Sequence, residues 1–228
     1  MMHNYAAATA VAHPGFLSIT QLRPEDMFNL LDLSREFRSK TISPRLLEGK
    51  SVAMIFQKPS LRTRVTFEVG IRQLGGWPVM LGPAESQLGE REAVQDVARN
   101  LSLWVDAIVA RVFAHRQLED LALFASVPVI NALSDSEHPC QVIADLLTLQ
   151  DKLSSFLNKE LVYIGDWNNV SRSLWQACSL VGLRFRAICP AGYGPASGEP
   201  VDWSTSPADV AGALFWDRET TPSIPSSN

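Results

Sequence analysis

The sequence predicts an α/β fold in which a parallel sheet is flanked by helices, and two observations predict it. Short runs of strand length, such as Ser51–Phe56 and residues 107–113, are almost continuously apolar instead of alternating with polar residues. Such runs are typical of strands buried on both faces. Stretches with apolar residues at helical spacing separate these runs, which is the pattern of a parallel sheet covered by helices.

The first series of elements begins near Phe16, after an Ala-rich extension at residues 1–15. Pro24 suits the first turn of a helix, and the apolar residues from Met27 to Phe37 then fall on one face of it. In chain order, the remaining predicted elements of this series are a strand at 51–56, a helix at 62–74 that two glycines end, a strand at 79–81, a helix at 92–104, a strand at 107–113, a helix at 118–124, a strand at 127–131 and a helix at 138–153.

A second, shorter series follows, with a strand at 161–165, a helix at 171–181 and a strand at 185–189. These elements are too few to close a core of their own. From residue 196 the periodicity stops and Pro, Ser and Thr become frequent, which is typical of poorly ordered segments. We therefore expect an extension at 1–15, a large domain at 16–152, a partial second domain at 153–195 and a poorly ordered tail at 196–228.

The composition, with 46% hydrophobic and 19% charged residues, is that of a soluble globular protein. The formal net charge of −4 argues against nucleic-acid binding, which needs a dense basic surface. No apolar stretch is long enough to span a membrane. The three cysteines form no Cys-x-x-Cys pair, and the N-terminus lacks the features of a signal peptide. We therefore predict a cytoplasmic protein with neither a nucleic acid nor a membrane as partner.

The segment PSLRTR, at residues 59–64, lies between a predicted strand and a predicted helix. The first turn of a helix presents unpaired backbone N–H groups and partial positive charge, so it attracts anions. The hydroxyl groups of Ser60 and Thr63 and the guanidinium group of Arg62 or Arg64 add donors that suit a phosphate. Taken alone, the segment is equally consistent with a serine N-cap beside two surface arginines.

Further polar residues follow other predicted strands. Arg111 lies near the end of an apolar strand, which suggests a binding position, although a strand-end arginine that reaches solvent is the ordinary alternative. His138 and Gln141 lie three apart at a helix start, so both can donate hydrogen bonds to a carbonyl oxygen that gains negative charge. The alternative for this pair is a capping histidine with a solvated glutamine. Cys140 has no base placed to activate it and is interpreted as a packed residue.

Together these residues follow the strands of one predicted sheet, where ligands of parallel sheets bind. The segments that carry them resemble the aspartate and ornithine carbamoyltransferases. FQKPSLRTRVTFEVG is similar to the F-x-x-P-S-T-R-T-R-x-S-F-E motif of that family, and ESQLGERE, ARVF, SDSEHPCQVIADLLTL and GDWNNV match further family segments in the expected order. The resemblance covers residues 16–195. It is closest to the ornithine branch, because residues 77–95 contain Gln-Leu-Gly and no Lys.

This resemblance implies transfer of the carbamoyl group of carbamoyl phosphate to the side-chain amine of ornithine, in arginine biosynthesis and the urea cycle. It also implies two α/β domains, the first of which binds carbamoyl phosphate, a homotrimer with shared active sites, and no metal or organic cofactor. Carried over by motif, the residues at the phosphate are Ser60, Leu61, Arg62 and Thr63. Those at the carbamoyl group are Arg111, His138 and Gln141. The resemblance also implies that Gln87 reaches the next subunit's site and that Asn169 contacts ornithine.

The sequence departs from the family pattern in several places. Leu61 stands where Thr is usual, which removes a hydroxyl but keeps the backbone N–H, so we expect weaker phosphate binding. Trp167 stands where a small residue is common. The Asp-x-x-x-Ser-Met-Gly and His-Cys-Leu-Pro segments that bind ornithine in the family do not occur. Two or three lost contacts of about 1.5–3 kcal/mol each would lower the rate by about a thousandfold or more.

The alternative to a working ornithine enzyme is therefore a truncated relative that binds carbamoyl phosphate with weak transfer or none. An aspartate-specific or other carbamoyltransferase is disfavoured by the Lys-free loop.

Overall fold

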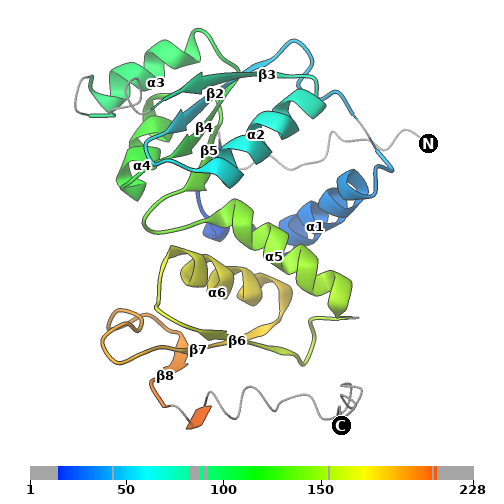
Figure 1. Cartoon of the computed structure of the whole chain (residues 1–228), viewed down its shortest axis with the longest axis vertical. Coiled ribbons are helices and arrows are strands. Elements are labelled where there is room, and N and C mark those ends of the chain that lie inside the picture. The colour runs from blue at the N-terminus through cyan, green and yellow to red at the C-terminus, as the bar shows by residue number, and fades with distance from the viewer. Residues whose placement is uncertain are drawn as a thin grey trace, which may run out of the picture.

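A computed structural model of the chain describes residues 15–42, 44–82, 88–89, 92–153, 155–206 and 208–209. Its larger sheet contains five strands in the order β1-β5-β4-β2-β3, and every neighbouring pair is parallel (Figure 1). This arrangement confirms the predicted α/β fold. The strands are β1 (Gly15–Phe16), β2 (Ser51–Phe56), β3 (Trp77–Leu81), β4 (Ala107–Arg111) and β5 (Val129–Leu133).

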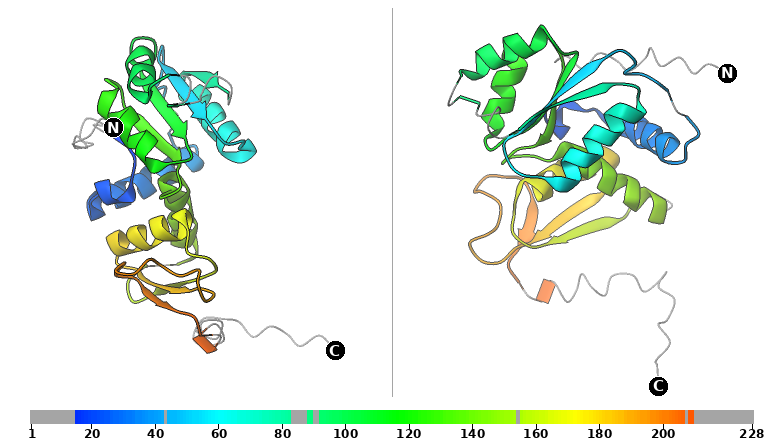
Figure 2. Two further views of the ribbon diagram at one scale, coloured as in Figure 1. Left: turned by 90° about the vertical axis from the view of Figure 1, so that its left-hand side faces the viewer. Right: turned by 45° about the horizontal axis from the view of Figure 1, so that its top comes forward.

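Helices cover this sheet on both faces, which explains why its strands are apolar throughout. On β2, Met54 packs toward α2 (Leu61–Gln73), while Ile55 packs toward α3 (Val94–Ser102) and α4 (His115–Phe124). Figure 2 shows α2 on one side of the sheet and α3 and α4 on the other. Successive side chains of a strand point to opposite faces, so both sets must be apolar here.

Three helices lie between the larger sheet and a second, smaller one (Figure 1). They are α1 (Pro24–Arg38), α5 (Pro139–Lys152) and α6 (Asn169–Val181), and η2 (Ile19–Gln21) packs with them. Their buried side chains form one apolar cluster that also includes side chains of the smaller sheet. Among the described residues, no helix is both long and apolar enough to cross a membrane.

The smaller sheet contains β6 (Glu160–Ile164), β7 (Arg184–Ile188) and β8 (Asp202–Ser204), all parallel. Since β8 lies inside the segment from residue 196, the expectation of a poorly ordered tail is wrong at this strand. A 2.6 Å ion pair between Arg172 and Glu199 holds the preceding loop on α6. The strand is too short to show a periodicity in the sequence. Residues 210–228 lie outside the described part of the chain.

The predicted helices and strands are confirmed in type, and their ends differ by a few residues. For example, α4 begins at His115, three residues before the predicted start, and β3 begins at Trp77. The elements that were not predicted are β1, η2 and β8. We propose that the domain boundary remains near residues 152–153 and that the second domain includes β8.

Candidate active site

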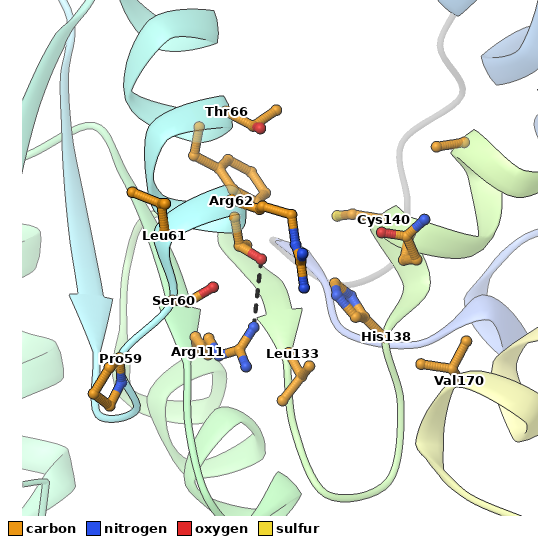
Figure 3. A pocket seen from close by; sticks show the side chains of 14 residues that line it. Pro59, Ser60, Leu61, Arg62, Thr66, Arg111, Leu133, His138, Cys140 and Val170 are labelled. Atoms are coloured by element: carbon orange, nitrogen blue, oxygen red, sulfur yellow. Dashed lines mark hydrogen bonds between the residues drawn. The ribbon is translucent and has the colours of Figure 1, made fainter.

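A cavity of about 720 Å³ opens where the carboxyl ends of β4 and β5 meet the starts of α2 and α5. Figure 3 shows Arg62, Arg111 and His138 pointing toward one another across it. This is the edge of the sheet at which ligands bind in parallel α/β folds. The predicted site residues that line the cavity are Ser60, Leu61, Arg62, Thr63, Arg111, His138 and Gln141.

The start of α2 forms one wall of the cavity. Ser60 is the N-cap residue and has an extended backbone, but its side chain makes no capping hydrogen bond. The alternative of a serine N-cap beside two exposed arginines thus holds for the positions of these residues, but not for a capping bond from the Ser60 hydroxyl. Arg62 lines the cavity, whereas Arg64 on the same turn does not. In the part of the chain that the structure describes, neither arginine forms an ion pair within 4.0 Å, so the first turn of α2 carries uncompensated positive charge.

Arg111 ends β4 at an irregularity in the pairing with β5. Its Nη1 donates a 3.4 Å hydrogen bond to the hydroxyl of Thr63, and its Nε is buried without a partner. Burial lowers the pKa of the guanidinium group from its ordinary value. The alternative of an arginine that simply reaches solvent is wrong, because part of the guanidinium group is buried and faces α2.

His138 lies at the start of α5 and is 9% exposed. Its backbone N–H donates a 3.0 Å hydrogen bond to the Ser173 hydroxyl of α6, while its side chain makes no capping bond and its Nδ1 is buried without a partner. Burial, together with the charge of Arg111, lowers the pKa of the imidazole to about 4. The ring is therefore neutral near pH 7, and its buried nitrogen needs a hydrogen-bond partner that a ligand could supply.

Gln141 and Cys140 occupy the first turn of α5. Gln141 is exposed, as in the alternative of a solvated glutamine, and its Nε2 donates a 2.9 Å hydrogen bond to Asp145 Oδ1 one turn later. The Cys140 thiol donates to the carbonyl of Asn131, at 3.5 Å, and burial raises its pKa to about 12. Because only the thiolate is a nucleophile, this arrangement agrees with the interpretation of Cys140 as a packed residue.

Of the predicted site residues that the structure describes, Asn169 does not line this cavity. Asn169 is the first residue of α6, and its Nδ2 donates a 2.6 Å hydrogen bond to the carbonyl of Ser134. Its neighbour Val170 lines the cavity instead. Gln87 lies outside the described residues. Trp167 also lies away from the cavity lining and packs against Trp175 and Phe185, with ring centroids 6.4 and 6.2 Å away.

Other lining residues were missed by sequence reasoning. Thr66 lies one helical turn after Arg62, so the spacing of α2 could have identified it. Val170 belongs to the second series of elements, and only the tertiary arrangement brings it to the cavity. Across residues 15–209, as far as they are described, no group of three or more His, Cys, Asp or Glu side chains could hold a metal ion.

Comparison with known proteins gives a consistent result. Residues 15–151 match the family model described as aspartate/ornithine carbamoyltransferase, carbamoyl-P binding domain. The ornithine carbamoyltransferase of Shewanella oneidensis is 47% identical over 181 residues, which are 79% of this chain and 60% of that protein. The one from Pyrococcus horikoshii is 45% identical over 202 residues, or 87% of this chain and 63% of that protein. The chain thus spans about three fifths of the length of these relatives.

Solved structures agree with the sequence matches. The ornithine carbamoyltransferase of Thermus thermophilus superposes with a TM-score of 0.81 at 41% identity, over 86% of this chain and 70% of the other. The enzyme from Pyrococcus furiosus gives a TM-score of 0.77 at 43% identity, over 82% of this chain and 60% of the other.

Proposed function

Because the chain belongs to the aspartate/ornithine carbamoyltransferase family, we propose that it transfers the carbamoyl group of carbamoyl phosphate to the side-chain amine of ornithine, giving citrulline and phosphate. The observation that carries this proposal is the convergence of the α2 start, Arg111 and His138 on one cavity. Carbamoyl phosphate joins a dianionic phosphate to a carbonyl group. It therefore needs donors for the phosphate, at the α2 start, beside donors for the carbonyl oxygen, at Arg111 and His138.

The phosphate group binds at the first turn of α2. The backbone N–H groups of this turn, the hydroxyls of Ser60 and Thr63 and the guanidinium group of Arg62 surround it. Leu61 contributes its backbone N–H. Helix N-termini bind anions through these unpaired N–H groups and the helix dipole. Arginine adds a charge-assisted fork.

The carbamoyl group lies between Arg111, His138 and Gln141. Both Arg111 Nε and His138 Nδ1 are buried without a partner in the described structure, so a ligand that supplies partners removes an unfavourable burial of polar atoms. The neutral state of His138 leaves one ring N–H to donate and one nitrogen to accept.

In the reaction, the neutral amine of ornithine attacks the carbamoyl carbon and forms a C–N bond. The carbonyl oxygen becomes an oxyanion, which fixed donors stabilise by about 3 kcal/mol each. The C–O bond to phosphate then breaks, the phosphate leaves into the Arg62 side of the cavity, and the amine proton passes to it. Fixed donors at the oxyanion are more strongly engaged in this transition state than in the ground state.

Further parts of the site belong to the same proposal. We assign the contact with ornithine to Asn169, which keeps Oδ1 as an acceptor and one N–H as a donor after Nδ2 donates to the carbonyl of Ser134. Gln87 reaches the active site of a neighbouring subunit in a homotrimer. The reaction belongs to arginine biosynthesis in the cytoplasm.

The test is citrulline formation by the purified chain in the presence of carbamoyl phosphate and ornithine. Turnover that depends on both substrates supports the proposal. Binding of carbamoyl phosphate without turnover would identify a binding relative. The absence of both binding and turnover would refute the proposal.

The matched variants Arg62→Ala and Arg64→Ala locate the phosphate site. Both remove one positive charge from the same turn of α2, but only Arg62 lines the cavity. We expect Arg62→Ala to weaken phosphate binding by about 10–100-fold, since a hydrogen bond to a charged group contributes about 1.5–3 kcal/mol, and Arg64→Ala to change it by less than about threefold. Equal effects would remove Arg62 from its assigned role.

A further inference from the structure

We propose that Asp145 is a positioning residue, which fixes the amide of Gln141 so that the cavity prefers an –NH2 group over a –CH3 group on the carbonyl carbon of its ligand. This inference rests on the proposed function and adds a specificity determinant to it. Gln141 and Asp145 lie four residues apart on α5, so their side chains are neighbours on the helix surface. Gln141 lines the cavity and Asp145 does not.

The hydrogen bond between the two side chains decides which way the amide of Gln141 faces. Nε2 donates to Asp145 Oδ1 at 2.9 Å. A carboxylate accepts hydrogen bonds and donates none, so the flipped amide would place Oε1 against Oδ1, with two acceptors opposed. Without Asp145 the two amide orientations are nearly equal in shape, and both would be populated.

The fixed orientation leaves Oε1 on the side of the amide away from Asp145. In the described structure, no protein donor reaches this oxygen within hydrogen-bonding distance. Among the described residues that line the cavity, the other polar side chains carry hydrogens they can donate: Ser60, Arg62, Thr63, Thr66, Arg111, His138 and Cys140. Gln141 therefore supplies the one acceptor-only side-chain oxygen of this lining.

Carbamoyl phosphate has a matching feature. Its phosphate and carbonyl oxygens accept hydrogen bonds, which the arginines and hydroxyls can donate, whereas its –NH2 group donates and needs an acceptor. Oε1 of Gln141 meets that need. This role differs from the expectation that Gln141 donates to the carbonyl oxygen. Gln141 is exposed in this structure, so Oε1 is open to water until a ligand covers it. An acyl phosphate with –CH3 in place of –NH2 would cover Oε1 without supplying a hydrogen bond, which disfavours that ligand.

Two stable phosphonates test this inference directly. Phosphonoacetamide and acetonylphosphonate have the same charge and nearly the same shape, and differ by –NH2 against –CH3. Their affinities are measured by calorimetry for the wild type, Asp145→Asn, Asp145→Glu and Asp151→Asn. Because the two ligands carry equal charge, the ratio of their affinities cancels the long-range effect of removing a carboxylate. Asp151 is the matched control, since it lies on α5 and pairs with Arg38 instead.

We expect the wild type to prefer phosphonoacetamide by about tenfold, the equivalent of one hydrogen bond of about 1.4 kcal/mol. Asp145→Asn, whose side-chain amide can accept or donate, should lower this preference to about threefold or less. Asp145→Glu, which keeps an acceptor-only carboxylate, and Asp151→Asn should retain it.

The failure of this inference is distinguishable from failure of the proposed function. If the wild type binds inorganic phosphate and both phosphonates, but shows no preference or keeps it in Asp145→Asn, the role of Asp145 is overturned and the carbamoyl-phosphate site stands. If the wild type binds neither phosphonate nor phosphate, the proposed function itself is overturned.

Discussion

The carboxylate of Glu137 accepts a 2.6 Å hydrogen bond from the hydroxyl of Ser18, which lies 119 positions earlier in the chain. Its other oxygen accepts from the Ile19 N–H at 3.0 Å and from the Ser173 hydroxyl at 3.4 Å. Ser173 in turn accepts the backbone N–H of His138. The position of His138 in the cavity thus depends on three segments that are far apart in the sequence, joined by one buried carboxylate.

Replacement of Glu137 by alanine should destabilise the fold by about 3 kcal/mol. Glu137 is 6% exposed, and its removal leaves the Ile19 N–H buried without an acceptor, which is among the costly classes of substitution. Urea unfolding followed by circular dichroism measures this loss. Glu48→Ala is the control, because Glu48 pairs with Arg45 on the exposed surface, where such pairs contribute less than about 1 kcal/mol. Equal effects of the two variants would contradict the structural role of Glu137.

The free energy of unfolding should decrease as the pH is lowered, because His138 is neutral in the folded protein. Its pKa is lowered from 6.5 to about 4 by burial and by Arg111, so between these values the unfolded chain binds more protons than the folded one. Stability is therefore fully present above about pH 6.5 and is lost as the pH falls through about 4. The contribution amounts to about 3 kcal/mol in total, of which about 2 kcal/mol is lost between about pH 8 and pH 5.

The pH prediction is checked by urea unfolding of the wild type and of His138→Gln at several pH values. The variant lacks the titrating ring. Between about pH 8 and pH 5, its free energy of unfolding should therefore decrease by about 2 kcal/mol less than that of the wild type. Identical pH profiles would show that His138 does not titrate as described. A nitrogen-15 spectrum of the imidazole near pH 6 gives an independent measurement, in which the neutral ring is expected.

The sequence predicted most of the fold because the buried strands and amphipathic helices carry strong periodic patterns. The apolar run of β2 between α1 and α2 is an example. The sequence pattern could not predict β8, which is three residues long, or β1, which is two residues long. These strands are defined by their pairing with β7 and β5 and not by a local pattern.

The candidate site shows the same division between local and tertiary information. Arg62 and His138 were predicted from their places at helix starts, where local chemistry is informative. Ser18, Glu137 and Val170 were missed, since their contacts join residues far apart in the chain. Asn169 was predicted from a motif, but its Nδ2 donates a hydrogen bond to the backbone carbonyl of Ser134, a contact that only the tertiary structure reveals.

The cysteines should react slowly with thiol reagents in the folded protein. Burial raises the pKa of Cys140 and of Cys178 to about 12, and burial and Asp166 raise that of Cys189. Near pH 8 the thiolate fraction of the first two is about one in ten thousand. Labelling with dithionitrobenzoate should proceed much faster in urea, where three thiols become reactive. Rapid labelling of Cys140 without denaturant would contradict its packed environment.

Introduction of a hydroxyl at Leu61 should strengthen phosphate binding. Leu61 is 76% exposed, lines the cavity and is the first residue of α2, so Leu61→Thr adds a donor beside the proposed phosphate position. One additional hydrogen bond to a charged group contributes about 1–2 kcal/mol, or about 5–30-fold in affinity for phosphate. Because the leucine is exposed, the free energy of unfolding should change by less than about 0.5 kcal/mol.

Val65→Thr provides the matched control for this prediction. Val65 lies one turn later on α2, is 42% exposed and does not line the cavity. The same hydroxyl should therefore leave phosphate affinity unchanged there, and Val65→Thr exchanges two β-branched residues of similar helix propensity. Calorimetric titration with inorganic phosphate compares the two. If Leu61→Thr binds phosphate no better than Val65→Thr, the phosphate does not lie at the first turn of α2.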